Sequence, residues 1–181
     1  MLYLVRHGET SMNKRNLMCG RTDAELTEKG KAAASDTGKK LKDIGFSAAF
    51  CSPMKRAKQT LELILSENCR PSPEKFEDSR ITERDFGYFE VQTDKTHPEF
   101  HLRWRLDYDS GRVYMESIAR MKERIGSFLA DVRRKYASEN VLVVTHNGAI
   151  RIFRLLLGEG ADQDDIIRLG IDNADILAYP L

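Results

Sequence analysis

The chain has 181 residues, of which 41% are hydrophobic and 31% carry a charge, and its formal net charge is +1. These values are ordinary for a globular protein, and the length predicts a single domain over residues 1–181. The near-zero net charge gives no electrostatic reason to expect nucleic acid or an anionic membrane as a partner. No stretch is long enough for a membrane span, and three cysteines without metal-type spacing favour reduced thiols in the cytoplasm.

The first predicted element is a strand formed by a short apolar run, Leu2 to Val5. It ends in Arg6-His7-Gly8, and packing alone gives no reason for an arginine and a histidine at the end of a buried strand. Chemistry on an anion does give one. The polar segment from Asn13 to Asp23 is predicted to be a loop over the strand end. A helix with Thr27 as its N-cap then runs to Leu41.

A second strand is predicted from Ser47 to Cys51, directly before the dipeptide Ser52-Pro53. Serine is a favoured N-cap residue and proline is favoured at the first helical position, so this dipeptide predicts a helix start. Arg56 then lies in the first turns of a helix that follows a strand. Its guanidinium and the free N–H groups of the helix are both expected near the carboxyl edge of the sheet, where they would attract an anion.

The middle of the chain is less regular. Residues 75–77 are a candidate third strand, and residues 81–87 form a charged loop. The segment 91–114 interleaves histidines, aromatic residues and arginines, and it is predicted to form a flap over the site. A long amphipathic helix is predicted from about Met115 to Tyr136, because apolar residues recur there at helical spacing. They are Ile118, Met121, Ile125, Phe128, Leu129, Val132 and Tyr136.

The C-terminal part repeats the pattern of the N-terminus. The apolar run Val141 to Val144 leads into Thr145-His146-Asn147-Gly148, followed by a helix to Leu157 and an edge strand from Asp175 to Tyr179. Strands that alternate with helices predict an α/β fold, a three-layer sandwich with a mostly parallel sheet and helices on both faces. If the two histidine-bearing strands are parallel neighbours, their histidines face each other across one cavity at the carboxyl ends.

Taken together, these motifs resemble the histidine phosphatase superfamily, the phosphoglycerate mutase-like group. The matching motifs occur in the family's order over most of the chain. They are Arg6-His7-Gly8-Glu9-Thr10 with Asn13, Leu26-Thr27-x-x-Gly30, Ser52-Pro53-x-x-Arg56-Ala57-x-Gln59-Thr60, Glu83 before Phe86-Gly87, and His146 before Gly148. The resemblance implies a phosphoglycerate mutase-like fold and phosphoryl transfer through a phosphohistidine, with no cofactor and no metal ion.

The resemblance also implies roles for individual side chains. His7 would be the nucleophile, a neutral imidazole whose other ring nitrogen donates to a fixed acceptor, expected to be a backbone carbonyl. Arg6 and Arg56 would bind the phosphoryl oxygens, and His146 would add a donor as an imidazolium. Glu83 would be the general acid, and later the base that activates water. By the family pattern, further residues would line the substrate pocket: Asn13, Gly20 and Asn147.

The chain departs from the usual family pattern at four places. Met12 stands where tryptophan is common, and Cys19 precedes Gly20 where a polar residue is common. Phe89-Glu90-Val91 replaces aromatic-Glu-Gly, and Met115-Glu116-Ser117 replaces Gly-Glu-Ser. None of these departures affects the two arginines and two histidines, so the predicted reaction type stands. They bear instead on the identity of the substrate and on the position of the predicted flap.

The leading hypothesis is a phosphomonoesterase acting on a small phosphorylated metabolite, as a monomer or a homodimer. A phosphoglycerate mutase is the closest rival: the Glu83-Arg84 pair favours it, whereas the chain lacks room for the extra basic segment of those enzymes. A narrower alternative is the α-ribazole phosphate phosphatase of cobalamin synthesis. Two hypotheses from other classes are a metal hydrolase using His7, Glu9 and His146, and an inactive phosphate-binding module.

Overall fold

In the computed structural model, which describes residues 1–93, 115–160 and 163–181, five strands form one sheet. Their order is β3-β2-β4-β1-β5. The strands are β1 (Leu2–Arg6), β2 (Ala48–Cys51), β3 (Glu74–Glu77), β4 (Val141–Thr145) and β5 (Ile176–Tyr179). All neighbours pair in parallel except the edge strand β5, which runs antiparallel to β1. The predicted mostly parallel sheet, including the third strand and the final edge strand, is confirmed.

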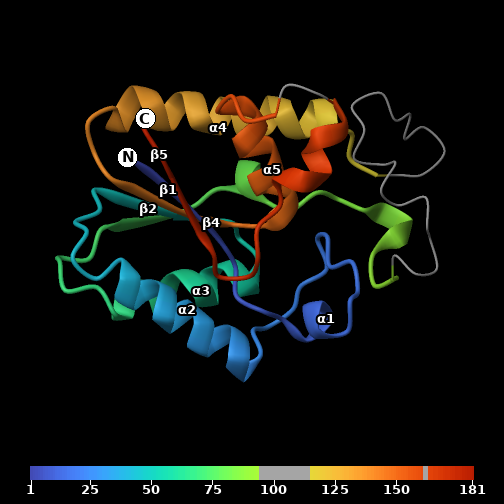
Figure 1. Cartoon of the computed structure of the whole chain (residues 1–181), viewed down its shortest axis with the longest axis horizontal. Helices are drawn as coiled ribbons and strands as arrows, with labels where there is room; N and C mark the ends of the chain where they lie inside the picture. Colours follow the sequence, from blue (N-terminus) through green and yellow to red (C-terminus); the bar gives the residue numbers. More distant parts are fainter. Residues whose placement is uncertain (94–114, 161–162) are drawn as a thin grey trace.

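Helices cover both faces of this sheet (Figure 1). One face carries α2 (Glu28–Lys40) and α3 (Lys55–Ser66), and the other carries α4 (Ile118–Tyr136) and α5 (Asn147–Leu156). The predicted α/β three-layer sandwich is therefore confirmed. The described residues also contain three 3₁₀ segments: Ser79–Ile81, Gly87–Phe89 and Gln163–Leu169. No helix among the described residues has both the length and the apolar character needed to cross a membrane.

Side chains of the central strands alternate between two hydrophobic cores. Leu2, Leu4 and Val143 point to the core beneath α4 and α5, whereas Val5 and Val144 point to the core beneath α3. This alternation follows from the two-residue period of a strand. Both central strands are therefore anchored on their two faces, and their carboxyl ends are held at one edge of the sheet.

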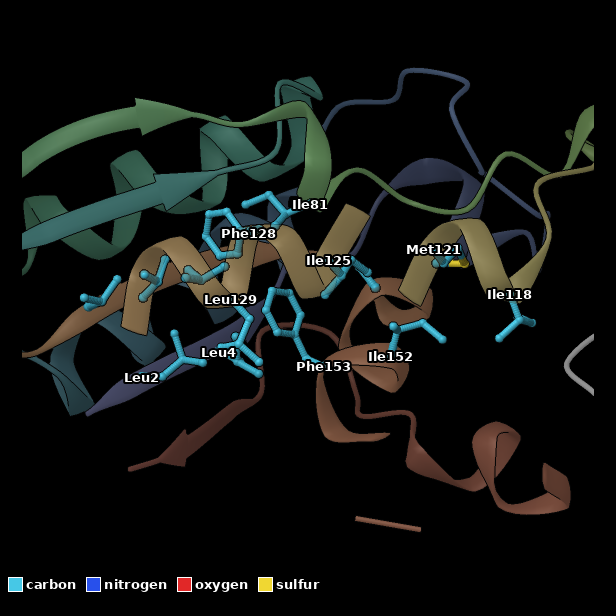
Figure 2. Packing of buried hydrophobic residues seen from close by; sticks show 14 of the residues in the cluster. Leu2, Leu4, Ile81, Ile118, Met121, Ile125, Phe128, Leu129, Ile152 and Phe153 are labelled. Atoms are coloured by element: carbon cyan, nitrogen blue, oxygen red, sulfur yellow. The ribbon is translucent and has the colours of Figure 1, made fainter. Parts of the chain in front are cut away.

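The larger core is organised by α4 (Figure 2). All seven residues of the predicted apolar stripe are buried, so this prediction is confirmed. The Phe128 ring lies edge-to-face against Phe50 of β2 and Phe153 of α5, with centroid separations of 5.3 and 5.9 Å. The helix begins three residues later than predicted, at Ile118, because Ser117 is its N-cap and accepts a hydrogen bond from the Arg120 amide.

Two predictions near the site are wrong in detail. The helix α3 begins at Lys55 with Met54 as N-cap, and not at Ser52-Pro53. The Ser52 hydroxyl accepts from the amide of Met54, the residue just before the helix, at 3.3 Å, and it also contacts a histidine ring at 2.7 Å. The polar loop after β1 contains a four-residue helix, α1 (Ser11–Lys14), closed by a capping box between Thr10 and Asn13.

Most of the predicted flap, residues 94–114, lies outside the residues that the structure describes. Of its described beginning, Thr93 forms an isolated bridge with Leu17 in the loop after β1. The prediction of a flap therefore stays a prediction.

The turn after β1 packs against the first turn of α2 with no space between the two backbones. Thr27 caps α2 as predicted, accepting from the Gly30 amide, and a methyl group on Gly30 would lie 2.1 Å from the Glu9 carbonyl oxygen. Gly126 of α4 is also helical, but its nearest neighbour would be Leu156 Cδ1 at 3.8 Å. Only the first glycine is required by its surroundings.

These two glycines give a matched prediction about stability. Gly30→Ala should lower the free energy of unfolding by about 3 kcal/mol, because backbone atoms must move to accept the methyl group. Gly126→Ala should raise it by about 0.5–1 kcal/mol, because alanine loses less conformational entropy in a helix. Urea denaturation of both variants measures the two changes, and a change of the same sign in both would contradict the packing described here.

Candidate active site

The site begins with the pairing of β1 and β4. The two strands are parallel neighbours, with Arg6 opposite Thr145, and the His7 amide donates to the Thr145 carbonyl at 2.9 Å. Both strands end at the same edge of the sheet, as predicted. The rings of His7 and His146 are in contact there, with centroids 5.1 Å apart and planes inclined by 61°.

A cavity of about 210 Å³ opens at this edge. Its walls come from the ends of β1 and β4, the loop after β1, the first turns of α3 and α5, and the loop around Glu83. The lining residues are Arg6, His7, Asn13, Leu17, Met18, Cys19, Gly20, Arg56, Glu83, Phe86, Asn147, Gly148 and Arg151. Every residue predicted to bind substrate is among them except His146, which lies behind the wall and is fully buried.

His7 is held in one orientation. Its Nδ1 lies 2.8 Å from the Gly8 carbonyl oxygen, which fits the expected backbone acceptor and assigns the proton to Nδ1, leaving Nε2 unprotonated. Burial lowers the pKa of His7 well below 6.5, and the neighbouring cations Arg56 and Arg6 lower it further. The imidazole is therefore neutral at pH 7, with a lone pair on Nε2.

Arg56 is completely buried and is fixed by three acceptors. Its Nη1 donates to the Thr22 carbonyl at 2.9 Å, its Nη2 to the Gly20 carbonyl at 2.6 Å, and its Nε to Nδ1 of His146 at 3.1 Å. A guanidinium has five N–H donors, so two remain for a ligand in the cavity. The loop of residues 20–22 thus aims this cation without using all of its donors.

The prediction that His146 is an imidazolium donor is wrong for this structure. Its Nδ1 accepts from Arg56, so the ring proton lies on Nε2, which donates to the Ser52 hydroxyl at 2.7 Å. Burial and the charge of Arg56 lower the pKa of His146 well below 6.5. His146 is a neutral residue that orients Arg56 and packs on His7.

Arg6 carries the second guanidinium of the predicted pair. Its Nη1 donates to the Ile171 carbonyl at 2.6 Å, while its buried Nε has no acceptor among the described residues. Burial lowers the pKa of Arg6 below its ordinary value, and the charge of Glu83 opposes that change. A half-buried guanidinium with an unused donor on the wall of a cavity is suited to bind an oxyanion.

Glu83 also lines the cavity and is 8% exposed. One carboxylate oxygen accepts from the Arg84 amide at 2.7 Å, and the other accepts from the Gly148 amide at 3.0 Å, in the first turn of α5. These bonds connect the loop that carries Glu83 to the helix that follows His146. The carboxylate is thereby fixed within the same cavity as His7.

The pocket residues predicted from the family pattern also take part in the framework. The Asn13 side-chain oxygen accepts from the Thr10 amide and hydroxyl, and the Asn147 side-chain oxygen accepts from the Ile171 amide. The Gly20 carbonyl holds Arg56, as described above. All three therefore position neighbouring groups as well as lining the cavity.

Sequence reasoning missed Arg151, a third guanidinium on the cavity wall. Burial lowers the pKa of Arg151 to about 10; the charge of Glu83 opposes this change, and the charge of Arg6 adds to it. The sequence does contain a signal for it: Arg151 follows the predicted pocket residue Asn147 by four positions, so both lie on one face of the predicted helix. Arg151 also borders a second pocket of about 470 Å³, which Arg6 and Asn147 line as well.

Comparison with known proteins agrees with this geometry. The chain matches the sequence profile of the histidine phosphatase superfamily (branch 1) over residues 2–179. This chain belongs to that superfamily. It is therefore an enzyme of a family of phosphatases and mutases that act on small phosphorylated substrates.

Three relatives illustrate the match. A 2,3-bisphosphoglycerate-dependent phosphoglycerate mutase of Bartonella bacilliformis is 30% identical over 176 residues, covering 92% of this chain and 84% of the relative. A mycobacterial glucosyl-3-phosphoglycerate phosphatase, solved with VO3, is 24% identical with a TM-score of 0.82, covering 97% and 88%. The alpha-ribazole phosphatase of Shigella flexneri is 23% identical with a TM-score of 0.79, covering 97% of this chain and 87% of that structure. The two structures show the likeness of the fold.

Within this histidine phosphatase fold, Glu90 holds the loop that aims Arg56. Its Oε1 accepts from the Arg21 amide and its Oε2 from the Thr22 amide, both at 2.8 Å. Gly20 has a left-handed φ of +50°, and a side chain there would overlap the Glu90 carboxylate. Glu90 thus sets the carbonyls that bind the guanidinium.

The three ligands of the alternative metal site are not assembled. The Glu9 carboxylate has other partners: it accepts from the Thr27 hydroxyl at 2.9 Å and pairs with Lys29 at 3.4 Å. The described parts of the chain contain no group of three or more His, Cys, Asp or Glu side chains that could hold a metal ion.

The two buried histidines predict how stability depends on pH. Their folded-state pKa lies below the unfolded value of about 6.5, so the unfolded state binds more protons under acidic conditions. The stability present above pH 6.5 should fall as the pH drops below it, by up to about 1.4 kcal/mol per pH unit for each histidine. Urea midpoints between pH 8 and pH 5 measure this slope. His7→Gln should reduce it, and a pH-independent midpoint in the unsubstituted chain would contradict the neutral assignment.

A second prediction concerns the loop of residues 20–22. Glu90→Ala should weaken binding of inorganic phosphate about tenfold, equivalent to about 1.4 kcal/mol, because the carbonyls that aim Arg56 lose their support. The control is Glu25→Gln, since Glu25 is exposed and its distance to Lys55 is 4.0 Å. Isothermal titration calorimetry compares the affinities. Equal affinity in Glu90→Ala and in the control would show that the loop needs no such support.

Proposed function

We propose that this chain is a phosphomonoesterase that hydrolyses a small phosphorylated metabolite through a phosphohistidine on His7. One observation carries the proposal: a neutral, fixed imidazole lines a cavity whose charged groups are three guanidiniums and one carboxylate. Such a cavity suits a dianion that contains an electrophilic atom. A phosphate monoester has both properties.

In the first step, Arg6 and Arg56 bind the phosphoryl oxygens, since their planar N–H groups match phosphate geometry and stay charged. The Nε2 lone pair of His7 attacks phosphorus in line with the ester oxygen. An N–P bond forms and the P–O bond to the alcohol breaks. Glu83, in its protonated form, gives its proton to the departing oxygen, which leaves as a neutral alcohol.

In the second step, water replaces the alcohol. Glu83, now a carboxylate, takes a proton from the water as its oxygen attacks phosphorus. The N–P bond breaks, inorganic phosphate is formed, and His7 regains its neutral state. The hydrogen bond from Nδ1 to the Gly8 carbonyl supports both steps, because it stabilises the positive charge that the phosphorylated ring carries.

The guanidiniums also supply the charge that a metal ion supplies in other phosphatases. Removing one such preorganised donor costs on the order of 10²–10³ in rate in enzymes that stabilise an oxyanion. Three of these cations on the wall would repel a divalent cation. We therefore infer that the reaction needs no metal, and activity should survive EDTA.

A mutase remains the second candidate, since the Bartonella relative is named a phosphoglycerate mutase and the Glu83-Arg84 pair is present. A mutase returns the phosphoryl group to a phosphoglycerate and must hold its carboxylate. Arg84 is 1% exposed and its Nε donates to the Glu116 carbonyl at 2.7 Å, which favours a role in bracing the loop over one in binding a substrate. This contact supports the phosphatase.

The proposal is tested by trapping the intermediate. Rapid acid-free quenching of the enzyme with ³²P-labelled substrate should leave an acid-labile label on His7, and His7→Ala should carry none. A panel of phosphorylated metabolites, including 3-phosphoglycerate and α-ribazole phosphate, should release inorganic phosphate. Formation of 2-phosphoglycerate without phosphate release would make the chain a mutase. A labelled residue other than His7 would exclude the proposed route.

A further inference from the structure

We propose that Arg124 of α4, together with Glu116, positions Glu83 for proton transfer. The inference rests on the proposed function, because it concerns the general acid of that reaction. Neither residue lines the cavity of about 210 Å³. Their effect would therefore pass through the loop of residues 80–85, and Arg124 is a positioning residue and not a catalytic one.

Arg124 is bonded to three successive parts of that loop. Its Nη1 donates to the carbonyls of Arg80 and Thr82 at 2.7 and 2.8 Å, and its Nη2 donates to the carbonyl of Glu83 at 3.3 Å. One guanidinium thus ties the backbone of the acid itself to a helix buried in the main core. Lysine could not supply this anchor, because it lacks the planar arrangement of donors.

The second half of the guanidinium binds Glu116. The Nε and Nη2 atoms of Arg124 donate to the two carboxylate oxygens at 2.7 and 2.9 Å, a bidentate pair whose side chains are 15% and 9% exposed. Two parallel charge-assisted bonds fix the orientation of both partners. The Arg124 fork therefore cannot rotate without breaking this pair.

Glu116 then contacts the other side of the same loop. Its amide donates to the Asp85 carbonyl at 2.9 Å, and its carbonyl accepts from Arg84 Nε at 2.7 Å. The loop is consequently held before Glu83 by Arg124 and after Glu83 by Glu116. The Glu83 residue is the part of the loop between these two attachments.

The consequence for chemistry comes from the contacts of the carboxylate. Glu83 bonds to the amide of Arg84 in its own loop and to that of Gly148 in α5. If the loop shifted, the Arg84 amide would move with it and the bond to the Gly148 amide would lengthen. The carboxyl group of Glu83 would then lie farther from the leaving oxygen. A displacement of about 1 Å in a reacting group can cost on the order of 10² in rate.

A purely structural role predicts a different result. If the pair served only folding, a variant would lose stability or would lose activity equally toward all substrates. If the pair positions the acid, the loss should depend on the leaving group, since only a basic alkoxide needs a proton in the transition state. The ratio of kcat/KM for an alkyl and an aryl phosphate separates the two cases, because kcat/KM reports phosphorylation of His7 and not hydrolysis of the phosphohistidine.

The experiment compares glycerol 3-phosphate with p-nitrophenyl phosphate in the unsubstituted enzyme and four variants. Arg124→Lys should lower kcat/KM about tenfold or more for glycerol 3-phosphate, and less than about threefold for p-nitrophenyl phosphate. Glu83→Gln is the reference for a lost acid, with an expected loss of about 10²–10⁴ for the alkyl substrate. The matched control is Arg134→Lys on the same helix, since Arg134 pairs with Asp131 at 2.9 Å but is 80% exposed. Its ratio should equal that of the unsubstituted enzyme.

Glu116→Gln keeps the shape of the side chain and guards against a variant that fails to fold. It should change the substrate ratio in the same direction as Arg124→Lys. The basic limb of the pH profile for glycerol 3-phosphate should also shift in both variants, while thermal unfolding verifies that each is folded.

An equal loss for both substrates, or no loss in either folded variant, would overturn the positioning role. A Glu83→Gln enzyme with an unchanged substrate ratio would overturn it too, because Glu83 would not be the acid. Failure of the proposed function would instead appear in the unsubstituted enzyme, as the absence of label on His7. The two failures are therefore distinguishable.

Discussion

The parallel pairing of β1 with β4 fixes both the core and the site. The register sets Leu2 opposite Val141 and Arg6 opposite Thr145, so the residues that follow, His7 and His146, emerge side by side. A slip of one residue would turn the apolar side chains of one strand toward the opposite core. It would also separate the two imidazoles. The hydrophobic pattern that stabilises the fold is thus the same pattern that assembles the chemistry.

Electrostatics at that edge follow from burial next to cations. Arg56 and Arg6 disfavour a charged imidazole, and burial disfavours it more strongly, so the same environment that attracts an anion keeps His7 neutral. The two guanidiniums are in turn stabilised by carbonyl oxygens, chiefly those of Gly20, Thr22 and Ile171. Carbonyl dipoles compensate a buried positive charge only in part, and a bound phosphate monoester would supply the missing negative charge.

Patterns local in sequence were sufficient for the strands, the long stripe of α4 and the motif residues, because periodicity and strand ends encode them directly. The partners of polar side chains were not predictable in the same way. Ser52 has the local signature of an N-cap and accepts from the Met54 amide, but its hydroxyl also pairs with a histidine 94 positions away. The protonation state of His146 depends on that bond and on Arg56, and neither is visible from its neighbours in sequence. Such contacts exist only once the sheet has formed.

The contacts of Glu90 and Glu116 explain which parts of the family pattern this chain keeps. Val91 stands where glycine is usual, and its φ of +65° lies in the left-handed region that favours glycine and penalises a β-branched residue. Met115 also replaces a glycine, but its side chain is buried in the main core. The glutamate beside each replaced glycine is retained: Glu90 holds the loop that aims Arg56, and Glu116 binds Arg124 and the loop of Glu83. The chain therefore tolerates an unfavourable backbone position or a new core side chain at these places, while the two carboxylates that hold the loops beside the cavity are kept.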